Sequence, residues 1–239
     1  MTGMAEKIVD LLARRFWWWA PVVAAVLVLF PQIDLWVSGW FYIPGDGFAL
    51  GRAHLLQFLR KGLPPILFGI VAYVMVLWLA GRLLRIHFWG INGRVTLYLA
   101  GTLAVGPGLI VNTLFKDNWG RARPSQIEAF GGDSLFSRAV FWSDQCDKNC
   151  SFVSGHAAMG FWVIAFAFLT PKPWRAPAIL AALAFGFFIG WVRIIQGGHF
   201  FSDVVFAGMI TVGVCWGGYR WLIPSHSVAT SGDRPVPGS

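Results

Sequence analysis

Six long apolar runs restrict what this chain can fold into. A helix needs about 20 mostly apolar residues to cross the hydrocarbon core of a bilayer. Such runs fall at 16–39, 63–84, 95–115, 152–170, 176–195 and 200–223. Because 56% of the residues are hydrophobic and only 13% are charged, the pattern predicts an all-α polytopic membrane protein, a bundle of six transmembrane helices, rather than a soluble enzyme.

The length of the chain suits a single membrane domain, which we assign to residues 1–224. Residues 225–239 are rich in Ser, Gly and Pro and are predicted to form a disordered tail. The first apolar run is followed by Pro31 and Gln32 rather than by a small-residue cleavage site, so we expect a retained helix and not a cleavable signal peptide. Pro31 and Asp34 interrupt that run, and its boundary is correspondingly soft.

Net charge helps to choose the partner and the orientation. The formal charge is +8, but the basic residues lie in loops between apolar runs and form no continuous cationic face, which argues against nucleic acid. The two termini and the loops around residues 82–94 and 172–175 share one side and are rich in Lys and Arg. The positive-inside rule therefore predicts cytoplasmic termini, with the remaining loops outside.

Cysteine usage bears on the compartment. Cys146 and Cys150 lie four residues apart in a polar loop on the predicted outside, whereas Cys215 is alone in the last run. A close pair in such a loop favours a disulfide in an oxidising compartment, although a metal site or two free thiols are alternatives. A disulfide would place this loop in a periplasm or at the cell exterior.

Three polar fragments lie at the predicted outer ends of the apolar runs. They are Lys116 with Arg123 and Pro124, then Ser154, Gly155 and His156, then Arg193, His199 and Asp203. Ionisable groups at membrane boundaries are costly unless they pair, reach water or bind a substrate. Six such groups on one face indicate a functional site, and a structural ion-pair cluster is the alternative.

The fragments read Lys116-x6-Arg123-Pro124, Ser154-Gly155-His156 and Arg193-x5-His199-x3-Asp203. Their order and spacing resemble the type 2 phosphatidic acid phosphatase family of integral membrane lipid phosphatases, over about residues 94–223. Within that family the chain is most similar to the branch that acts on lipid A. Val153 stands where the family usually has Pro, and Val192 stands where it often has Ser. Neither position needs to supply a catalytic proton.

The fragments hold groups suited to binding phosphate. A phosphate monoester carries close to two negative charges, which Arg binds through a planar fork of donors and Lys through a compact charge. The residues expected to hold the phosphate oxygens are Lys116, Arg123, Arg193, Ser154 and Gly155, the last through backbone N–H groups near a helix N-terminus. Arg121 is expected to face lipid headgroups instead.

The histidines would supply the chemistry. His199 and Asp203 share a face if a helix has begun there, so the carboxylate can accept a hydrogen bond from one ring nitrogen and leave the other to attack phosphorus. The resemblance implies that His199 is the nucleophile that forms a phosphohistidine, and that His156 is the general acid and then the general base. No metal or other cofactor is expected, because three cations offset the phosphate charge and no carboxylate cluster is evident.

The resemblance thus implies a metal-independent phosphatase of a phosphorylated lipid, with lipid A favoured, at the periplasmic face of a bacterial inner membrane. Undecaprenyl diphosphate, phosphatidylglycerophosphate and phosphatidate are alternative substrates. A phosphotransferase would use the same residues and pass the phosphoryl group to a lipid acceptor. A noncatalytic lipid-binding or transport protein would keep the cations but have little need for the pair of His199 and Asp203. The sequence does not indicate the oligomeric state or the acyl-chain preference.

Overall fold

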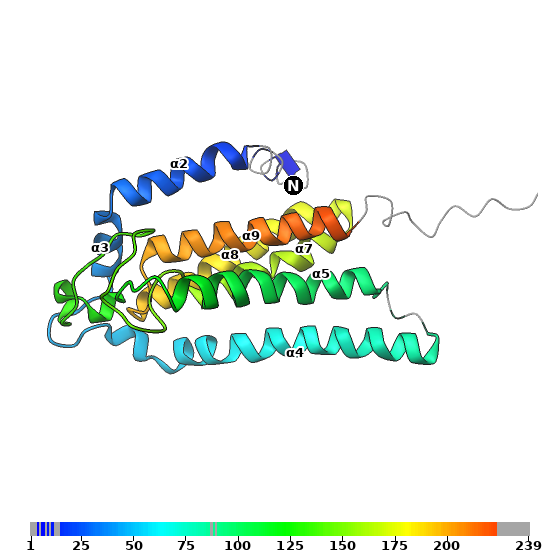
Figure 1. The fold of residues 1–239 in the computed structure, drawn as a ribbon, viewed down its shortest axis with the longest axis horizontal. Coiled ribbons are helices and arrows are strands. Elements are labelled where there is room, and N and C mark those ends of the chain that lie inside the picture. The colour runs from blue at the N-terminus through cyan, green and yellow to red at the C-terminus, as the bar shows by residue number, and fades with distance from the viewer. Residues whose placement is uncertain are drawn as a thin grey trace, which may run out of the picture.

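A computed structural model describes residues 4, 6, 7, 9, 11, 15–86, 88 and 90–223 of the chain. Within this part the fold is helical, with two isolated β-bridges and no named strand, which confirms the predicted all-α class. Figure 1 shows long helices side by side, with the longer loops gathered at one end. The tail predicted at 225–239 lies outside the described residues.

Four segments are long and apolar enough to cross a membrane. They are α4 (His54–Leu84), α5 (Gly93–Leu103) continued by the π-helix η2 (Ala104–Lys116), α8 (Lys172–Ile195) and α9 (Phe201–Leu222). Each corresponds to a predicted run. Helix α4 begins well before its run. Residues 54–62, a mixed apolar and basic segment, are therefore the first part of the same helix.

The first apolar run is not one straight span. It forms α2 (Phe16–Leu29) and α3 (Gln32–Gly39), whose axes differ by 78°. Pro31 lies at the break, where its missing N–H and its ring oppose continuation of the helix. The bend carries Asp34 into the end of the bundle, where its side chain is buried. The expectation of a single helix over 16–39 is therefore corrected to a broken pair.

The fourth run forms the shortest apolar segment, α6 (Gly155–Trp162) and α7 (Ile164–Leu169), with a break at Val163. Its 15 residues reach about 22 Å, whereas a bilayer core is about 30 Å thick. Buried residues such as Phe161, Trp162 and Ile164 show that this segment packs among the other helices. The six predicted runs therefore appear in order, but only four are full-length spans on their own.

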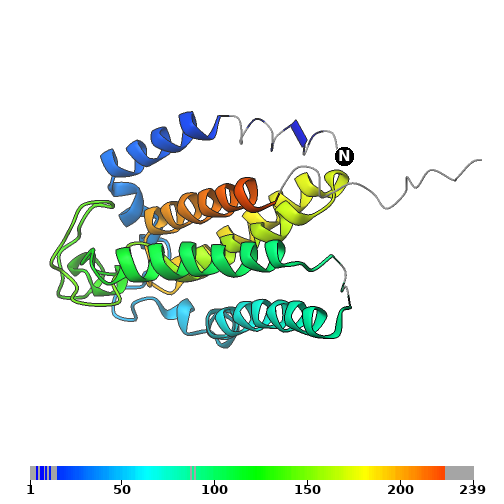
Figure 2. The same cartoon turned by 45° about the vertical axis from the view of Figure 1, so that its right-hand side comes forward.

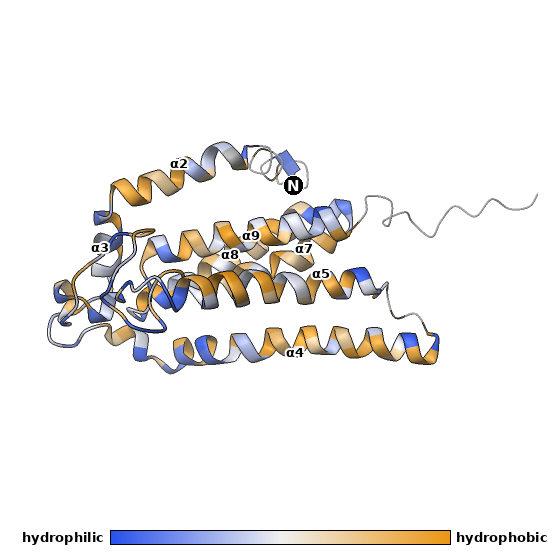
Figure 3. Ribbon diagram, viewed as in Figure 1, coloured by the Kyte–Doolittle hydropathy of each residue, from blue (hydrophilic) through white to orange (hydrophobic). Residues whose placement is uncertain are grey.

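The outer surface of the bundle is apolar. Large exposed hydrophobic residues on α4 include Phe68, Val76 and Leu83, and Figure 3 shows hydrophobic colour along the middle of the long helices. Such a surface suits lipid, because a helix satisfies its own backbone hydrogen bonds in hydrocarbon. The chain is a multi-pass membrane protein.

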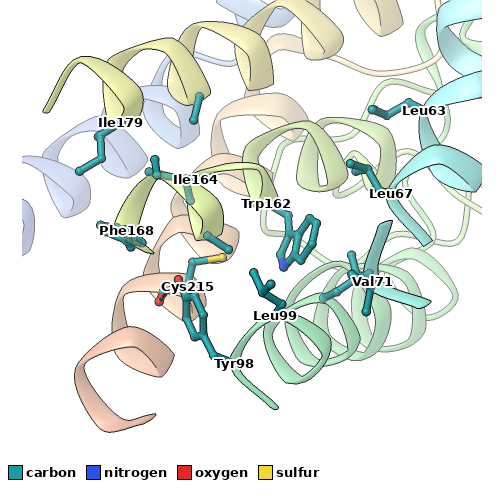
Figure 4. Close-up of a cluster of buried hydrophobic side chains, with 14 of the residues drawn as sticks. Leu63, Leu67, Val71, Tyr98, Leu99, Trp162, Ile164, Phe168, Ile179 and Cys215 are labelled. Carbon is teal, nitrogen blue, oxygen red and sulfur yellow. Dashed lines mark hydrogen bonds between the residues drawn. The ribbon is translucent and has the colours of Figure 1, made fainter. Parts of the chain in front are cut away.

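The main core cluster fixes α6 in the middle of the bundle. Figure 4 shows Trp162 between side chains of α4 and α5, with Tyr98 and Cys215 nearby. The indole Nε1 of Trp162 donates to Thr102 Oγ1 at 3.0 Å, and Tyr98 Oη donates to the Cys215 carbonyl at 3.2 Å. Both polar groups are thereby satisfied in an apolar core. This packing holds the helix that begins directly after Ser154.

Candidate active site

The three fragments meet at one end of the bundle, where Figure 2 shows the loops gathered beside the helix ends. Backbone hydrogen bonds join them: Cys150 N donates to the Lys116 carbonyl at 2.9 Å, and Ser154 N donates to the Asp203 carbonyl at 3.2 Å. A third bond runs from Ser125 N to the Gly197 carbonyl at 3.0 Å. The loops thus bind the outer turns of η2, α6, α8 and α9 to one another.

The cations of the fragments lie close enough to interact electrostatically. Lys116 interacts with Arg123 and Arg193, and Arg60 of α4 acts on both arginines. Burial, followed by the charge of Arg60, lowers the pKa of Arg123. Within the described residues none of these four cations forms a salt bridge with a carboxylate. Their mutual repulsion would be relieved by a bound anion, which makes this cluster a candidate phosphate site.

Arg60 is a site residue that the sequence motifs missed. It belongs to the mixed apolar and basic segment before the second apolar run, and nothing in that segment marks one arginine over another. Helix α4 places it beside the site, where its backbone lies within hydrogen-bonding reach of His156. The ring of His156 also interacts with the charges of Arg193 and Lys116.

Arg193 is held by its neighbours in a defined position. Its Nη1 donates to Gln196 Oε1, and Gln196 Nε2 donates to the Leu56 carbonyl at 3.1 Å. A Cβ atom at Gly198 would lie 2.8 Å from Arg193 Cζ, so glycine leaves the space that the guanidinium occupies. Arg193 Nε is buried and has no hydrogen-bond partner in the described chain. One donor of the guanidinium is therefore available to an anion.

The start of α6 presents further donors. Ser154 is the N-cap, and its Oγ accepts a hydrogen bond from Ala157 N at 3.4 Å. The N–H groups of Gly155 and His156 precede the first helical hydrogen bonds, and such groups favour anions. A Cβ atom at Gly155 would lie 2.5 Å from Asn112 Oδ1, so glycine allows α6 to start directly against η2.

His199 is fully buried between α8 and α9. Its Nδ1 lies 2.7 Å from the Ser151 carbonyl, an atom that only accepts, so Nδ1 carries the proton and Nε2 carries the lone pair. Nε2 is buried and has no partner in the described part of the chain. Burial, together with the charges of Arg193 and Lys116, lowers the pKa of His199 to about 3 although Asp203 acts in the opposite direction. The ring is therefore neutral at neutral pH, the form that can act as a nucleophile.

The contact expected between His199 and Asp203 is indirect. His199 Nδ1 lies 3.8 Å from Asp203 Oδ2, beyond hydrogen-bond length. Ser151 connects them, because its Oγ donates to Asp203 Oδ2 at 2.5 Å while its carbonyl accepts from the ring. Phe200 N also donates to Oδ2 at 2.8 Å. Ser151 lies outside the motif that led to His156, so spacing alone did not reveal it.

Arg121 does not face lipid headgroups, contrary to expectation. It is fully buried, with Nη1 2.5 Å from Asp203 Oδ1 and Nη2 2.7 Å from Asp34 Oδ2. Burial alone would lower the pKa of Arg121, but the carboxylates of Asp203 and Asp34 outweigh it and raise the pKa. The carboxylates of Asp203 and Asp34 explain why the Arg121 guanidinium is buried, since a buried charge needs a paired and hydrogen-bonded environment.

The long loop before α6 contains the predicted disulfide, which joins Cys146 to Cys150 and is confirmed. Cys150 N is also the donor to the Lys116 carbonyl, so the bridge lies beside the end of η2. Among the described residues no group of three or more His, Cys, Asp or Glu side chains is placed to hold a metal ion. The charged side chains that cluster with Lys116, namely Arg123, Arg193 and Arg60, are cations.

Residues 95–226 match the family model described as the PAP2 superfamily, and they make up more than half of the chain. The chain belongs to the PAP2 superfamily. The match contains every site residue predicted from the sequence motifs, whereas Asp34 and Arg60 lie before it.

The chain is also similar to curated proteins named lipid A phosphatases. It is 42% identical over 198 residues to the lipid A 4'-phosphatase of Francisella tularensis subsp. novicida, covering 79% of this chain and 86% of that protein. It is 34% identical over 206 residues to the lipid A 4'-phosphatase of Rhizobium leguminosarum, covering 80% of this chain and 87% of that protein. A lipid A 1-phosphatase of Rhizobium etli is 33% identical over 132 residues, covering 55% of this chain and 50% of that protein. No solved structure matches the chain.

Proposed function

We propose that this PAP2 protein hydrolyses the 4'-phosphate of bacterial lipid A through a phosphohistidine on His199. The observation that carries the proposal is the neutral, buried His199, whose Nε2 is unpartnered in the described chain and lies beside cations without carboxylate partners. The relatives named lipid A 4'-phosphatase support the substrate, because they match the chain over about four fifths of its length. The relatives named lipid A 1-phosphatase match about half of it or less.

In the first step Lys116, Arg123 and Arg193 hold the nonbridging oxygens of the phosphate, with the Ser154 hydroxyl and the N–H groups that begin α6 as further donors. His199 Nε2 attacks phosphorus as the bond from phosphorus to the sugar oxygen breaks. The bound phosphate dianion favours the cationic form of His156, which gives its proton to the departing oxygen and becomes neutral. The phosphorylated imidazole gains positive charge, which the Ser151 carbonyl and the nearby Asp203 carboxylate stabilise.

In the second step His156, now neutral, takes a proton from water. The resulting hydroxide attacks phosphorus and breaks the bond from phosphorus to Nε2, which releases inorganic phosphate and regenerates neutral His199. We propose that no metal takes part, since the four cationic side chains supply the positive charge that a divalent ion would otherwise provide.

We further propose that the site faces the periplasm and that the termini are cytoplasmic. The disulfide in the loop before α6 supports this orientation, because such bonds persist in oxidising compartments. A reporter that is active only in the periplasm should be active when inserted after Asp133 and inactive at the C-terminus. The opposite pattern would overturn the orientation and leave the chemistry standing.

The activity is tested with detergent-purified protein, lipid A phosphorylated at both positions, and EDTA. We expect release of inorganic phosphate, and mass spectrometry should locate the loss at the 4' position. His199→Ala should abolish release, whereas His54→Ala, at an exposed histidine at the start of α4, should not. Transfer to a lipid acceptor without free phosphate would establish a phosphotransferase instead. Release from undecaprenyl diphosphate, phosphatidylglycerophosphate or phosphatidate alone would refute the proposed substrate.

A further inference from the structure

A buried polar network lies behind His199 and reaches back to the first helix pair. Arg121 Nη1 donates to Ser202 Oγ at 2.9 Å as well as to Asp203. Ser202 N and Ser202 Oγ donate to the two carboxylate oxygens of Asp34 at 2.8 and 2.5 Å. Arg121 Nη2 donates to Asp34. Each of these side chains is at most 1% exposed.

Arg121 cannot hold the phosphate, because its donors are used within the protein. Its Nε donates to the Ser137 carbonyl at 2.9 Å, and its Nη atoms bind the two carboxylates and Ser202. The ring of Phe200 covers the guanidinium at 4.3 Å. A role for Arg121 in the reaction would therefore act through Asp203 rather than through contact with the substrate.

We propose that Asp34 and Arg121 are positioning residues for the phosphoryl-transfer step, in which they hold the Asp203 carboxylate that fixes Ser151 and, through its carbonyl, the ring of His199. The inference rests on the proposed function, in which His199 is the nucleophile. Asp203 has one oxygen held by Arg121 and the other held by Ser151 Oγ and Phe200 N. Loss of Arg121 would free one side of this carboxylate.

Asp34 completes the arrangement electrostatically. Both Asp34 oxygens accept hydrogen bonds, from Arg121 Nη2, Ser202 N and Ser202 Oγ, which favours the ionised carboxylate against its burial. Arg121 alone would neutralise Asp203, whereas an ionised Asp34 adds a net negative charge behind the ring. That charge is needed when the ring becomes cationic during phosphoryl transfer. Asp34 also binds Ser202, which directly precedes Asp203 in the first turn of α9. It thus holds both the helix start and the guanidinium.

The test compares Asp34→Asn, Arg121→Gln and the double variant in the lipid A assay. We expect kcat to fall by about 100-fold in each single variant, as for a displaced catalytic group. The inhibition constant of inorganic phosphate should stay within about twofold, because the phosphate-binding cations are untouched. The double variant should lose less than the product of the two single losses, because the two residues contact each other and share Ser202 as a partner. Matched controls are Asp133→Asn and Arg138→Gln, at exposed positions of the loop before α6.

A purely structural role would lower the amount of folded protein but not the kcat of the molecules that fold. Rates are therefore expressed per protein that elutes at the wild-type position in size-exclusion chromatography. Asp34→Asn preserves side-chain size, so it carries the test if Arg121→Gln does not purify. Normal kcat in Asp34→Asn, or weaker phosphate inhibition with normal kcat, would overturn the inference. Activity that survives His199→Ala would instead overturn the proposed function.

Discussion

The backbone carbonyl of Ser151 accepts a hydrogen bond from Nδ1 of His199 at 2.7 Å. Every residue at position 151 that keeps the same backbone supplies this acceptor, so the ring tautomer does not depend on the serine side chain. The Ser151 hydroxyl has a separate role, as the donor to Asp203 Oδ2. The two contacts of one residue can therefore be separated by mutation.

We predict that Ser151→Ala lowers kcat about tenfold, the typical cost of one hydrogen bond to a charged group. KM should change little, because the phosphate-binding groups stay in place. Steady-state kinetics on lipid A measure both constants, with Ser125→Ala, an exposed serine, as the control. An unchanged kcat would mean that the hydroxyl does not help Asp203 to act on the ring.

Gly198→Ala tests how tightly Arg193 is held. The new methyl would lie 2.8 Å from Arg193 Cζ, so the guanidinium must move. We expect KM for lipid A to rise at least tenfold, on the order of a lost charged hydrogen bond. Gly213→Ala in α9 is the matched control, since a Cβ atom there has no neighbour within 4 Å. Equal effects of the two substitutions would contradict a specific role for the glycine.

Arg60→Ala removes a cation that no motif contains. Arg60 interacts electrostatically with Arg123, Arg193 and His156. We expect about a tenfold rise in KM and a weaker dependence of kcat/KM on salt, because one attraction to the phosphate is lost. Arg52, an exposed arginine paired with Asp46, supplies the control Arg52→Ala. A normal KM would place Arg60 outside the binding site.

The acidic side of the pH profile should not come from His199. Its pKa is lowered to about 3 by burial and by Arg193 and Lys116, compared with about 6.5 for an ordinary histidine. The lone pair on Nε2 therefore persists as the pH falls through the ordinary range. Single-turnover rates at pH 5 should stay within about threefold of those at pH 7 after correction for the substrate phosphate, which titrates near pH 6.

A second substrate is needed to distinguish titration of an enzyme group from titration of the substrate phosphate. An aryl phosphate has a lower second phosphate pKa than a sugar phosphate, so a limb that belongs to the substrate moves with it. An acidic limb in the rate of substrate consumption that stays near pH 6.5 with both substrates would belong to the enzyme. It would show that His199 is an ordinary histidine in solution, because His156 acts as an acid in that step and its titration would give an alkaline limb.

The sequence was most informative where one short fragment contained several functional residues. The spacing of His199 and Asp203 placed them on neighbouring turns, and the structure brings Ser151 between them. Ser151 escaped notice because its role depends on a carbonyl, which every residue has. Gln196 escaped notice for another reason: its side chain accepts from Arg193, but it stands at an unspecified position between Arg193 and His199.

Other features depend on contacts that no local pattern records. Asp34 and Ser202 are 168 positions apart, and in the sequence Asp34 was only an interruption in an apolar run. Arg121 lies at an unspecified position inside the first motif, and its burial follows from two distant carboxylates. The α6–α7 segment is shorter than a full span. Other helices surround it, so its length need not match the thickness of the bilayer.

The broken first helix pair has a consequence for biosynthesis. Ribosomes make Asp34 early, yet Arg121 follows 87 positions later and Ser202 follows 168 positions later. Until those partners are synthesised and inserted, the carboxylate has no counter-charge from this network and is best kept at the water interface. The bend at Pro31 allows that, since α3 need not lie along α2. The network behind the nucleophile His199 is therefore complete only when α9 packs against α3. A chain that stops before α9 would be inserted but inactive.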